Sequence, residues 1–407
     1  MARKLRVGVV FGGRSGEHDV SLRSAQTIMR AMDPDRFEIV PIGITREGRW
    51  LVGGDPLAAL AASARLPLAT GSTGDGAAIS RAGSPTALDV ADGSWTAGVD
   101  VLFPALHGPF GEDGTIQGML ELADVPYVGA GVLASALLMD KVVSRRLFQD
   151  AGLPLAPWTW VLRRDWEREP DAVRERIAQE IGFPCFVKPA NLGSSVGVSK
   201  AHDQDELSAA LTDAARYDRK IVIERGLNVR ELEVSILGND DPVASVVGEI
   251  VPANEYYDYH AKYVDDRSEL HIPASITPEQ AATVQALAIA AYRLADCAGM
   301  ARADFFLDVD SGAILLNELN TIPGFTASSM YPRLWEASGL PLRDLVSRLI
   351  DLALERYGYD VSDGPGAIVA FQRRFRPSNI DGVVDGETRA ILLGLLLTTP
   401  QEELRLA

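Results

Sequence analysis

The sequence contains few cysteines and no apolar run long enough to cross a membrane. Its 407 residues include two cysteines, Cys185 and Cys297, and neither belongs to a CxxC pair or lies in a histidine-rich stretch. Two isolated thiols in apolar surroundings indicate buried, reduced side chains, and they support neither a zinc site nor a secreted disulfide scaffold. No segment approaches the ~20 apolar residues that a transmembrane helix needs.

Positive charge is also scarce. The chain has 39 Lys and Arg residues against 56 Asp and Glu residues, a formal net charge of −17. A general nucleic-acid binder needs a basic face to engage phosphates, so this charge argues against that class. It does not exclude a nucleotide site, because such a site is local and a metal ion often bridges the protein to the phosphates.

The start of the chain lacks the features of a signal peptide. A basic beginning is followed by an apolar run that is too short, and this run leads directly into the glycine-rich residues 12–16 without a small-residue cleavage site. We therefore expect a buried first strand followed by a glycine turn, and a cytoplasmic protein.

The pattern of apolar runs predicts an α/β protein. Because 47% of the residues are hydrophobic, a chain of this length can bury the cores of two or three domains. Residues 5–44 alternate strand, helix (21–32) and strand, which indicates a βαβ unit and a parallel sheet with helices on its faces. Residues 54–98 are rich in Ala, Gly, Ser and Thr and predict a loop-rich insert.

Later segments predict a two-part α+β region and a short helical tail. Strands are expected at 99–106, 126–129, 159–162, 183–189, 221–224, 231–237 and 244–250, and helices at 114–122, 140–151, 169–181, 278–298 and 342–356. The predicted division is an N-terminal substrate-binding domain at 1–138, a central subdomain at 139–221, a catalytic subdomain at 222–358 and a tail at 359–407.

The most informative segment is a predicted β-hairpin between residues 300 and 320, with a turn at 308–312. Strand alternation places Arg302 and Asp304 on one face of the first strand, and Glu318 and Asn320 on one face of the second. If the strands pair, their oxygen ligands suit Mg²⁺ with substrate phosphates, and the arginine can hold a transferring phosphoryl group. The alternative is a surface hairpin with solvated charges.

Lys188 precedes a glycine–serine loop that ends at residue 199. Glycines let the backbone approach a phosphate, and successive amide groups can form an anion-binding concavity. Because the lysine precedes the glycines, this is not a Walker A loop. The alternative is a flexible hairpin turn.

Two acids, Glu224 and Glu231, are predicted at the ends of adjacent short strands. One could accept from an adenine amino group and the other from ribose hydroxyls, although surface acids at strand ends are common. The polar, aromatic loop 255–263 is a candidate lid, with Lys262 and Tyr263 positioned to contact phosphate and substrate. The alternative for this loop is an exposed, partly disordered segment.

The first strand and the strand that ends at His107 both present loops at the carboxyl edge of the predicted sheet, where ligands bind in open α/β folds. Glu17 in the first loop could hold a substrate ammonium group. His107 and His18 are each either functional or structural, and for His18 we favour the structural interpretation.

Seven segments together resemble the D-alanine–D-alanine ligase family of the ATP-grasp superfamily. The match runs over about residues 4–357, and the segments occur in the family's order: GGRSGEHDVS, ALHGPFGEDGTIQG, MDK, KPANLGSSVGVSK, YDYHAKY, ARADFF and NELNTIPGFTASSMYP. The resemblance implies an N-terminal parallel-sheet domain followed by a two-part ATP-grasp domain. It also implies that ATP phosphorylates a first D-alanine and that the amino group of a second D-alanine attacks the acyl phosphate.

The resemblance also assigns roles to individual residues. It gives Asp304, Glu318 and Asn320 to two Mg²⁺ ions, with Mn²⁺ as an alternative, and Arg302 and the Gly324 N–H to the developing oxyanion. It gives Lys141, Lys188, Ser195, Glu224, Glu231, Asn317 and the lid residue Lys262 to ATP. It gives Glu17, His107, Ser329 and Met330 to the substrates, and Ser194 with Tyr263 to a hydrogen-bonded link to the lid.

The family resemblance bears on partners and specificity as well. It implies a homodimer that acts on D-alanine and ATP, with no nucleic-acid or membrane partner. A tyrosine at position 263 favours D-alanine over D-lactate as the second substrate, whereas D-serine remains open. A different ATP-grasp ligase, or a wall-binding protein on an inactive ligase scaffold, are the alternatives, and the latter predicts decayed catalytic positions that the sequence does not have.

The last residues depart from the family. Apolar residues recur at helical spacing between Phe371 and Leu395, and Asp385 begins a plausible helix cap. This segment resembles the latter part of the peptidoglycan-binding-like region of N-acetylmuramoyl-L-alanine amidases. It is either a docking tail with weak contact to peptidoglycan or its precursors, or a helical pair packed on the ligase body. We favour the second, because two short helices bury little area alone.

Overall fold

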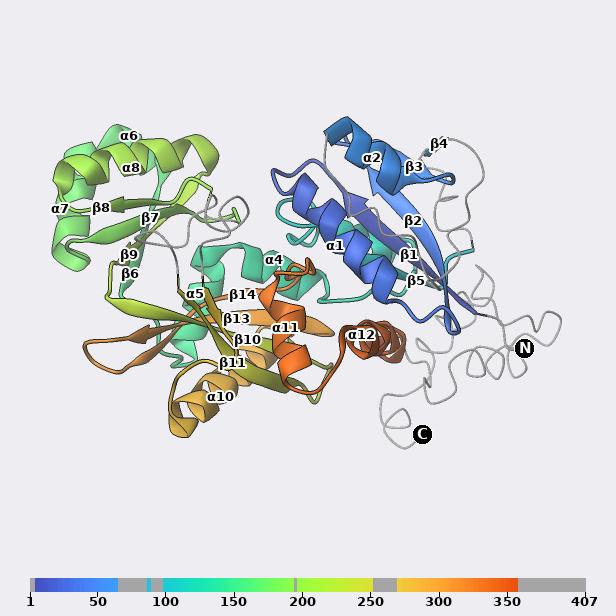
Figure 1. Ribbon diagram of the computed structural model, residues 1–407. Coiled ribbons are helices and arrows are strands. Elements are labelled where there is room, and N and C mark those ends of the chain that lie inside the picture. The colour runs from blue at the N-terminus through green and yellow to red at the C-terminus, as the bar shows by residue number, and fades with distance from the viewer. Residues whose placement is uncertain (1–3, 65–85, 89–97, 194–195, 252–268, 358–407) are drawn as a thin grey trace, which may run out of the picture.

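The structure is a computed structural model, and it describes residues 4–64, 86–88, 98–193, 196–251 and 269–357. Figure 1 shows three sheets, each with its own helices. Within the described part of the chain, no helix is long and apolar enough to cross a membrane. Cys185 and Cys297 are both buried free thiols, which confirms the interpretation of the two cysteines.

The N-terminal sheet has the strand order β4-β3-β2-β1-β5. Its strands are β1 (Leu5–Gly12), β2 (Phe37–Ile44), β3 (Trp50–Val52), β4 (Thr86–Leu88) and β5 (Val101–Pro104), and its helices are α1 (His18–Ala31), α2 (Pro56–Ala64) and α3 (Thr115–Leu122). Strands β1, β2 and β5 are parallel, as the βαβ pattern predicts, whereas β3 and β4 form an antiparallel edge.

Two expectations for this sheet differ from the structure. The segment 54–98 was expected to be loop-rich, but α2 and β4 account for most of its described residues, and the remainder, 65–85 and 89–97, lies outside the described part of the chain. The strand expected at 126–129 is a single bridge between Tyr127 and Leu102. It ends there because Gly129, at a φ of +102°, turns the chain out of the extended conformation.

The second sheet is antiparallel and has the order β6-β9-β7-β8. Its strands are β6 (Trp158–Leu162), β7 (Cys185–Pro189), β8 (Ser199–Ala201) and β9 (Lys220–Arg225), and its helices are α6 (Arg163–Arg168), α7 (Pro170–Glu180) and α8 (Gln204–Tyr217). The helix expected at 169–181 is α7. The sequence reading missed α6, a short helix that ends before Pro170, where the proline begins a new helix.

The third sheet carries the predicted hairpin and has the order β12-β11-β10-β13-β14. Its strands are β10 (Val229–Leu237), β11 (Val243–Val251), β12 (Glu269–His271), β13 (Met300–Asp308) and β14 (Ile314–Asn320), all antiparallel. Around it lie α4 (Val132–Met139), α5 (Lys141–Asp150), α10 (Pro278–Leu294) and α11 (Met330–Ala337). Helix α10 begins at a capping box formed by Thr277 and Gln280, and it ends before Asp296, whose φ is +54°.

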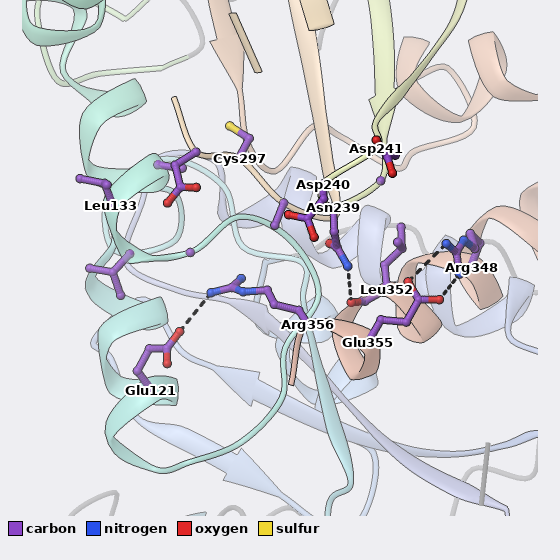
Figure 2. A pocket seen from close by; sticks show the side chains of 16 residues that line it. Glu121, Leu133, Asn239, Asp240, Asp241, Cys297, Arg348, Leu352, Glu355 and Arg356 are labelled. Atoms are coloured by element: carbon purple, nitrogen blue, oxygen red, sulfur yellow. Dashed lines mark hydrogen bonds and ion pairs between the residues drawn. The ribbon is translucent and has the colours of Figure 1, made fainter. Parts of the chain in front are cut away.

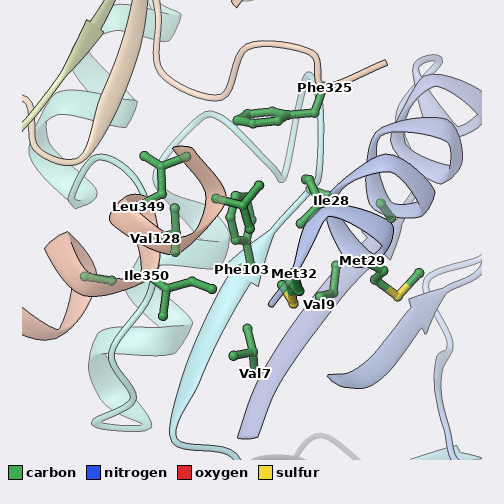
Figure 3. Packing of buried hydrophobic residues seen from close by; sticks show 14 of the residues in the cluster. Val7, Val9, Ile28, Met29, Met32, Phe103, Val128, Phe325, Leu349 and Ile350 are labelled. Carbon is green, nitrogen blue, oxygen red and sulfur yellow. The ribbon is translucent and has the colours of Figure 1, made fainter. Parts of the chain in front are cut away.

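Helix α12 (Leu342–Arg356) has the bounds that its periodicity predicts. Its apolar face does not pack on the third sheet alone. Leu349 and Ile350 join a core cluster with Val7 and Phe103 of the N-terminal sheet, as Figure 3 shows. A segment late in the chain therefore completes the core of the first domain and holds the N-terminal sheet beside the hairpin.

Candidate active site

The hairpin residues lie as their alternation predicts. Strand β13 pairs with β14 so that Arg302 lies opposite Asn320 and Asp304 lies opposite Glu318. On the other side of β13, Glu233 of β10 lies opposite Asp304. Directly opposed residues in antiparallel strands share a face, so three carboxylates stand in one row across three strands.

Arg302 lies among these acids and binds two of them. Its Nε and Nη2 donate to the two carboxylate oxygens of Asp304 at 2.7 and 2.6 Å, and its Nε is 3.0 Å from Glu233 Oε2. Desolvation opposes the charged guanidinium, but the charges of Asp304 and Glu233 outweigh it and raise the pKa of Arg302 well above its usual value. The arginine is therefore a fixed cation at the centre of the row.

Glu233 is a residue of this cluster that sequence reasoning missed. It lies about seventy positions before Arg302, and only the order of the strands brings the two together. The available signal was its place among the apolar residues Leu232, Val234 and Ile236 of β10, where an acid at 5% exposure needs a partner.

The hairpin contains a bulge beside the acids. The register shifts between Asp304 and Phe305, whose partners are Glu318 and Leu316, so Asn317 is the extra residue. A bulge redirects the side chains around it, and bulges are over-represented next to active sites. Both the backbone oxygen and the Oδ1 of Asn317 accept hydrogen bonds from Arg145 Nη2, at 3.2 and 3.3 Å.

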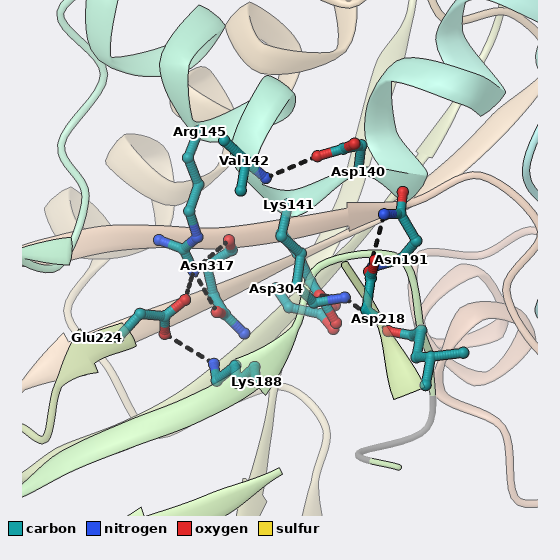
Figure 4. Close-up of polar contacts among 12 residues, drawn as sticks. Asp140, Lys141, Val142, Arg145, Lys188, Asn191, Asp218, Glu224, Asp304 and Asn317 are labelled. Carbon is teal, nitrogen blue, oxygen red and sulfur yellow. Dashed lines mark hydrogen bonds and ion pairs between the residues drawn. The ribbon is translucent and has the colours of Figure 1, made fainter. Parts of the chain in front are cut away.

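Lysines face the hairpin from two other elements, as Figure 4 shows. Lys141 begins α5, where Asp140 caps the helix, and its Nζ lies 3.5 Å from Glu318 Oε2 and donates to the Leu192 carbonyl at 2.8 Å. Lys188 on β7 donates to Glu224 Oε2 at 2.7 Å. The two predicted phosphate lysines thus come from different elements and lie with their charges beside carboxylates.

The placement of the two predicted nucleotide acids differs from the expectation. Glu224 and Glu231 follow each other along the chain, but β9 and β10 belong to different sheets. Glu224 is 2% exposed and forms ion pairs with Arg145 and Lys188. Desolvation raises its pKa, but these two cations outweigh it, and the pKa of Glu224 is below its usual value.

The carboxyl edge of the N-terminal sheet also contributes acids and a histidine. A Cβ on Gly108 would lie 2.5 Å from Glu17 Oε2, and a Cβ on Gly193 would lie 3.4 Å from it, so Glu17 lies between these two loops. His107 is buried, and its Nδ1 donates to the Ile322 carbonyl at 3.0 Å. Desolvation lowers the pKa of His107, although the charge of Glu17 opposes this effect, so burial favours the neutral ring.

The second histidine has the structural position that we favoured. His18 is 1% exposed, and its Nδ1 lies 2.7 Å from the Gly13 carbonyl oxygen. His107 differs because its Nε2 also lies 3.0 Å from the Ser24 hydroxyl, which accepts the backbone N–H of Phe325 at 3.2 Å. His107 therefore connects the first sheet to the segment after the hairpin.

The donor chemistry of the hairpin fits magnesium. Among the described residues, no group of three His, Cys, Asp or Glu side chains could hold a metal ion without other ligands. The hairpin offers two carboxylates and the amide of Asn320 on one face. Mg²⁺ prefers oxygen ligands and completes its coordination with water and substrate phosphates, so an incomplete set of this kind suits it.

Comparison with known proteins identifies the family. Residues 6–130 match the family model for the D-ala D-ala ligase N-terminus, and residues 147–351 match the model for the D-ala D-ala ligase C-terminus. The chain belongs to the D-alanine–D-alanine ligase family. It is 50% identical over 360 residues to the D-alanine–D-alanine ligase of Geobacillus thermodenitrificans, covering 87% of this chain and 96% of that relative. The corresponding ligase of Heliobacterium modesticaldum is 51% identical over 358 residues, with 87% and 96% covered.

Solved structures of ligases have the same fold. The VanG D-Ala:D-Ser ligase from Enterococcus faecalis superposes with a TM-score of 0.73 at 33% identity, covering 86% of this chain and all of that one (100%). The D-alanine–D-alanine ligase from Coxiella burnetii has a TM-score of 0.69 at 34% identity, covering 87% and 96%. These matches confirm the α/β fold class with an N-terminal sheet and a two-part ATP-grasp region.

The segment after the hairpin contains three further predicted site residues, Gly324, Ser329 and Met330. A Cβ on Gly324 would lie 2.9 Å from Ser329 Oγ, so the two residues are in close contact. Ser329 precedes α11, and its Oγ accepts the Thr326 N–H at 2.9 Å. The Met330 side chain is buried with Ile250 and Leu334, so only its backbone can serve a substrate.

Some predicted residues of the ligase site lie outside the described part of the structure. They are Ser194, Ser195, Lys262, Tyr263 and the tail 359–407. Their roles stay predictions.

A cavity of about 810 Å³ lies elsewhere, between α4, the turn 238–241 and α12, as Figure 2 shows. Its lining shares no residue with the Arg302 cluster.

Glu112 is a further acid that sequence reasoning did not single out. It lies in the quoted GEDG segment, and its Oε2 accepts the Gly108 N–H at 2.6 Å. Desolvation and the charge of Glu17 raise the pKa of Glu112 well above its usual value. The signal in the sequence was that Glu112 follows the predicted substrate residue His107 closely along the chain.

Proposed function

We propose that the row of Arg302, Asp304, Glu318 and Asn320 is the reaction centre of the chain. The chain catalyses the ATP-dependent ligation of two D-alanines to D-alanyl-D-alanine, for peptidoglycan precursor synthesis. The observation that carries this conclusion is the pairing of these four residues across β13 and β14 in a chain about half identical to curated ligases.

The first half of the reaction is phosphoryl transfer. Asp304, Glu318 and Asn320 would hold two Mg²⁺ ions, which neutralise the negative charge on the phosphates when bound. Lys141 and Lys188 hold the phosphates of ATP from α5 and β7. Arg302 moves part of its contact from Asp304 to the transferring γ-phosphoryl group, which joins the carboxylate of the first D-alanine to give an acyl phosphate and ADP.

The second half is aminolysis of the acyl phosphate. The amino group of the second D-alanine attacks the acyl carbon, and the new oxyanion is stabilised by Arg302 and the Gly324 N–H. The tetrahedral intermediate collapses, the C–O bond to phosphate breaks, and the dipeptide and inorganic phosphate form. The protein does little covalent work here, because its main contribution is to position the reactants and stabilise charge.

The first substrate is held at the edge of the N-terminal sheet. Glu17 faces the loops at Gly108 and Gly193, where its carboxylate can accept hydrogen bonds from the ammonium group of the first D-alanine. His107 donates through Nδ1 to Ile322, so it joins this subsite to the residues that precede Gly324. We place the carboxylate of the second substrate at Ser329 and the backbone of Met330, at the start of α11.

We also propose that ATP is bound by Glu224 and Glu231, with further contacts from Asn317, Ser195 and Lys262. Ser194 and Tyr263 form the hydrogen-bonded link to the lid. The domains are 1–138, 139–221, 222–358 and 359–407. The enzyme is a cytoplasmic homodimer, a location that suits its need for ATP, and the tail packs on the ligase body.

D-serine is the second candidate for the second substrate. It is supported by the similarity to the VanG ligase, whose name specifies D-Ala:D-Ser. The test supplies purified chain with ATP, Mg²⁺ and equal concentrations of D-alanine and D-serine, and identifies the products by mass. We expect D-alanyl-D-alanine as the main product, with phosphate release that depends on D-alanine. A main product of D-alanyl-D-serine would reassign the specificity, and no dipeptide would refute the function.

A further inference from the structure

Arg145 is a buried cation between the nucleotide side and the metal side of the site. It lies on α5, four residues after Lys141, so the two side chains share one face of the helix. Only 3% of its surface is exposed. A charged group at this depth needs partners, and Arg145 finds them on two different sheets.

One nitrogen of Arg145 makes these contacts. Its Nη2 forms an ion pair with Glu224 on β9 and donates to the backbone oxygen and Oδ1 of Asn317 on β14, as Figure 4 shows. The second oxygen of Glu224 accepts from Lys188 at 2.7 Å. A continuous polar connection therefore runs from Lys188 through Glu224 and Arg145 to the bulge next to Glu318.

Stability does not account for this arginine. Two other nitrogens of the guanidinium, Nε and Nη1, are buried and have no hydrogen-bond partner among the described residues. Each unsatisfied donor opposes folding, and a buried ion pair is often no more stable than an apolar replacement of similar volume. A purely structural position would favour an apolar side chain, so a buried charge with two unsatisfied donors indicates a function.

We propose that Arg145 is a positioning residue that sets the spacing between the phosphate lysine of β7 and the metal ligands of β14. It orients the Glu224 carboxylate, and thereby Lys188, while it holds the bulge that presents Glu318. The inference rests on the proposed roles of Lys188 and Glu318. Because one guanidinium contacts both sheets, the phosphates of ATP at Lys188 lie at the correct distance from the metal ligand Glu318.

The test compares three variants of the full-length chain. Arg145→Met removes the charge and retains the volume, and Arg145→Lys keeps a charge that can reach Glu224 without also holding Asn317. Arg146→Met is the matched control, because the Arg146 side chain is exposed and points away from the connection. Its Cζ lies 5.0 Å from the centre of the Trp160 ring. The measurements are kcat, the KM for ATP and for D-alanine, the Kd for ATP and the melting temperature.

We expect kcat/KM for ATP to fall about 10- to 100-fold in Arg145→Met, the range that a misplacement of about 1 Å produces. The KM for D-alanine should stay within about twofold, Arg145→Lys should recover part of the loss, and Arg146→Met should match the wild type. A change in melting temperature with unchanged ATP kinetics and affinity would overturn the proposal.

Two further measurements keep the test decisive. If Arg145→Met does not fold, Asn317→Ala removes the Oδ1 acceptor of the connection and leaves the backbone acceptor. This variant should lower kcat/KM for ATP by less than the full loss, and an unchanged value would refute the proposal. The double variant Asn317→Ala/Arg145→Lys should lower kcat/KM for ATP by less than the product of the two single fold-losses, because both substitutions act through one connection. A wild type that binds ATP but forms no dipeptide would refute the proposed function alone, since the Kd for ATP still tests Arg145.

Discussion

Glu112 is a carboxyl group held close to other acids of the site. Desolvation, together with the charges of Glu17 and Glu318, raises its pKa, and its hydrogen bond from the Gly108 N–H only partly compensates. Its raised pKa means that the folded protein keeps a proton that the unfolded chain releases. Glu17, which we propose holds the first substrate, and Glu112 beside it therefore share less negative charge than two ionised carboxylates would have.

This residue predicts a pH-dependent stability. Below the ordinary carboxyl pKa of 4.5 both states are protonated, so Glu112 has no effect on the unfolding free energy. As the pH rises above this value, the unfolded state ionises first and becomes favoured. Glu112→Gln cannot ionise, so its stability relative to the wild type should increase as the pH rises from 5 to 8. Urea denaturation of both proteins at pH 5 and at pH 8 measures this gain. A difference in unfolding free energy that is the same at both pH values would contradict the raised pKa of Glu112.

At the level of secondary-structure elements, the third sheet depends on polar pairs as well as on its apolar face. Arg230 on β10 donates through Nε and Nη2 to both oxygens of Glu249 on β11, each at 2.7 Å. The same Nη2 donates to the Ser275 carbonyl at 2.9 Å. Parallel hydrogen bonds of this kind fix the register of β10, and β10 in turn supplies Glu233, which forms an ion pair with Arg302.

The Arg230 pair predicts a pH effect of the opposite sign. The hydrogen bonds from Arg230 lower the pKa of Glu249 below its usual value of 4.5. The pair therefore stabilises the fold above this value and loses its contribution as the pH falls through the lowered pKa. Glu249→Gln should lose about 1.5 kcal/mol at pH 7 and much less at pH 3. Thermal or urea unfolding at these pH values gives the answer, and a loss that is equal at both would exclude an ionic origin.

Elements with a local pattern could be predicted from the sequence. The hairpin follows from alternation around a turn at Gly312, and α12 follows from a helical period that reaches the core on one face. Contacts between elements that are far apart in the sequence could not be predicted in this way. Glu233 meets Arg302 because β10 and β13 are neighbours in the third sheet, and Arg145 meets Glu224 because α5 packs against β9. Periodicity carries no information about such pairings.

At the level of the whole molecule, the site is assembled from all three sheets. The N-terminal sheet supplies Glu17 and His107, the second sheet supplies Lys188, and the third supplies the hairpin. Helix α12 packs into the first core and so keeps the substrate edge beside the hairpin. The fold class was recognised through the family resemblance, whereas this late return of the chain to the first core was not expected from the order of the predicted domains.

We propose that Arg302, Asp304, Glu318 and Asn320 on the β13–β14 hairpin form the reaction centre. The most direct test measures D-alanyl-D-alanine formation by the full-length chain with Arg302→Ala, with Glu318→Gln, and with Arg293→Ala as control. Arg293 lies on α10 and pairs at 3.6 Å with the exposed Asp241. We predict that the first two variants lose at least about 100-fold in kcat with an unchanged circular-dichroism spectrum, while the control keeps wild-type turnover. Near-normal turnover in Arg302→Ala or Glu318→Gln would contradict the account.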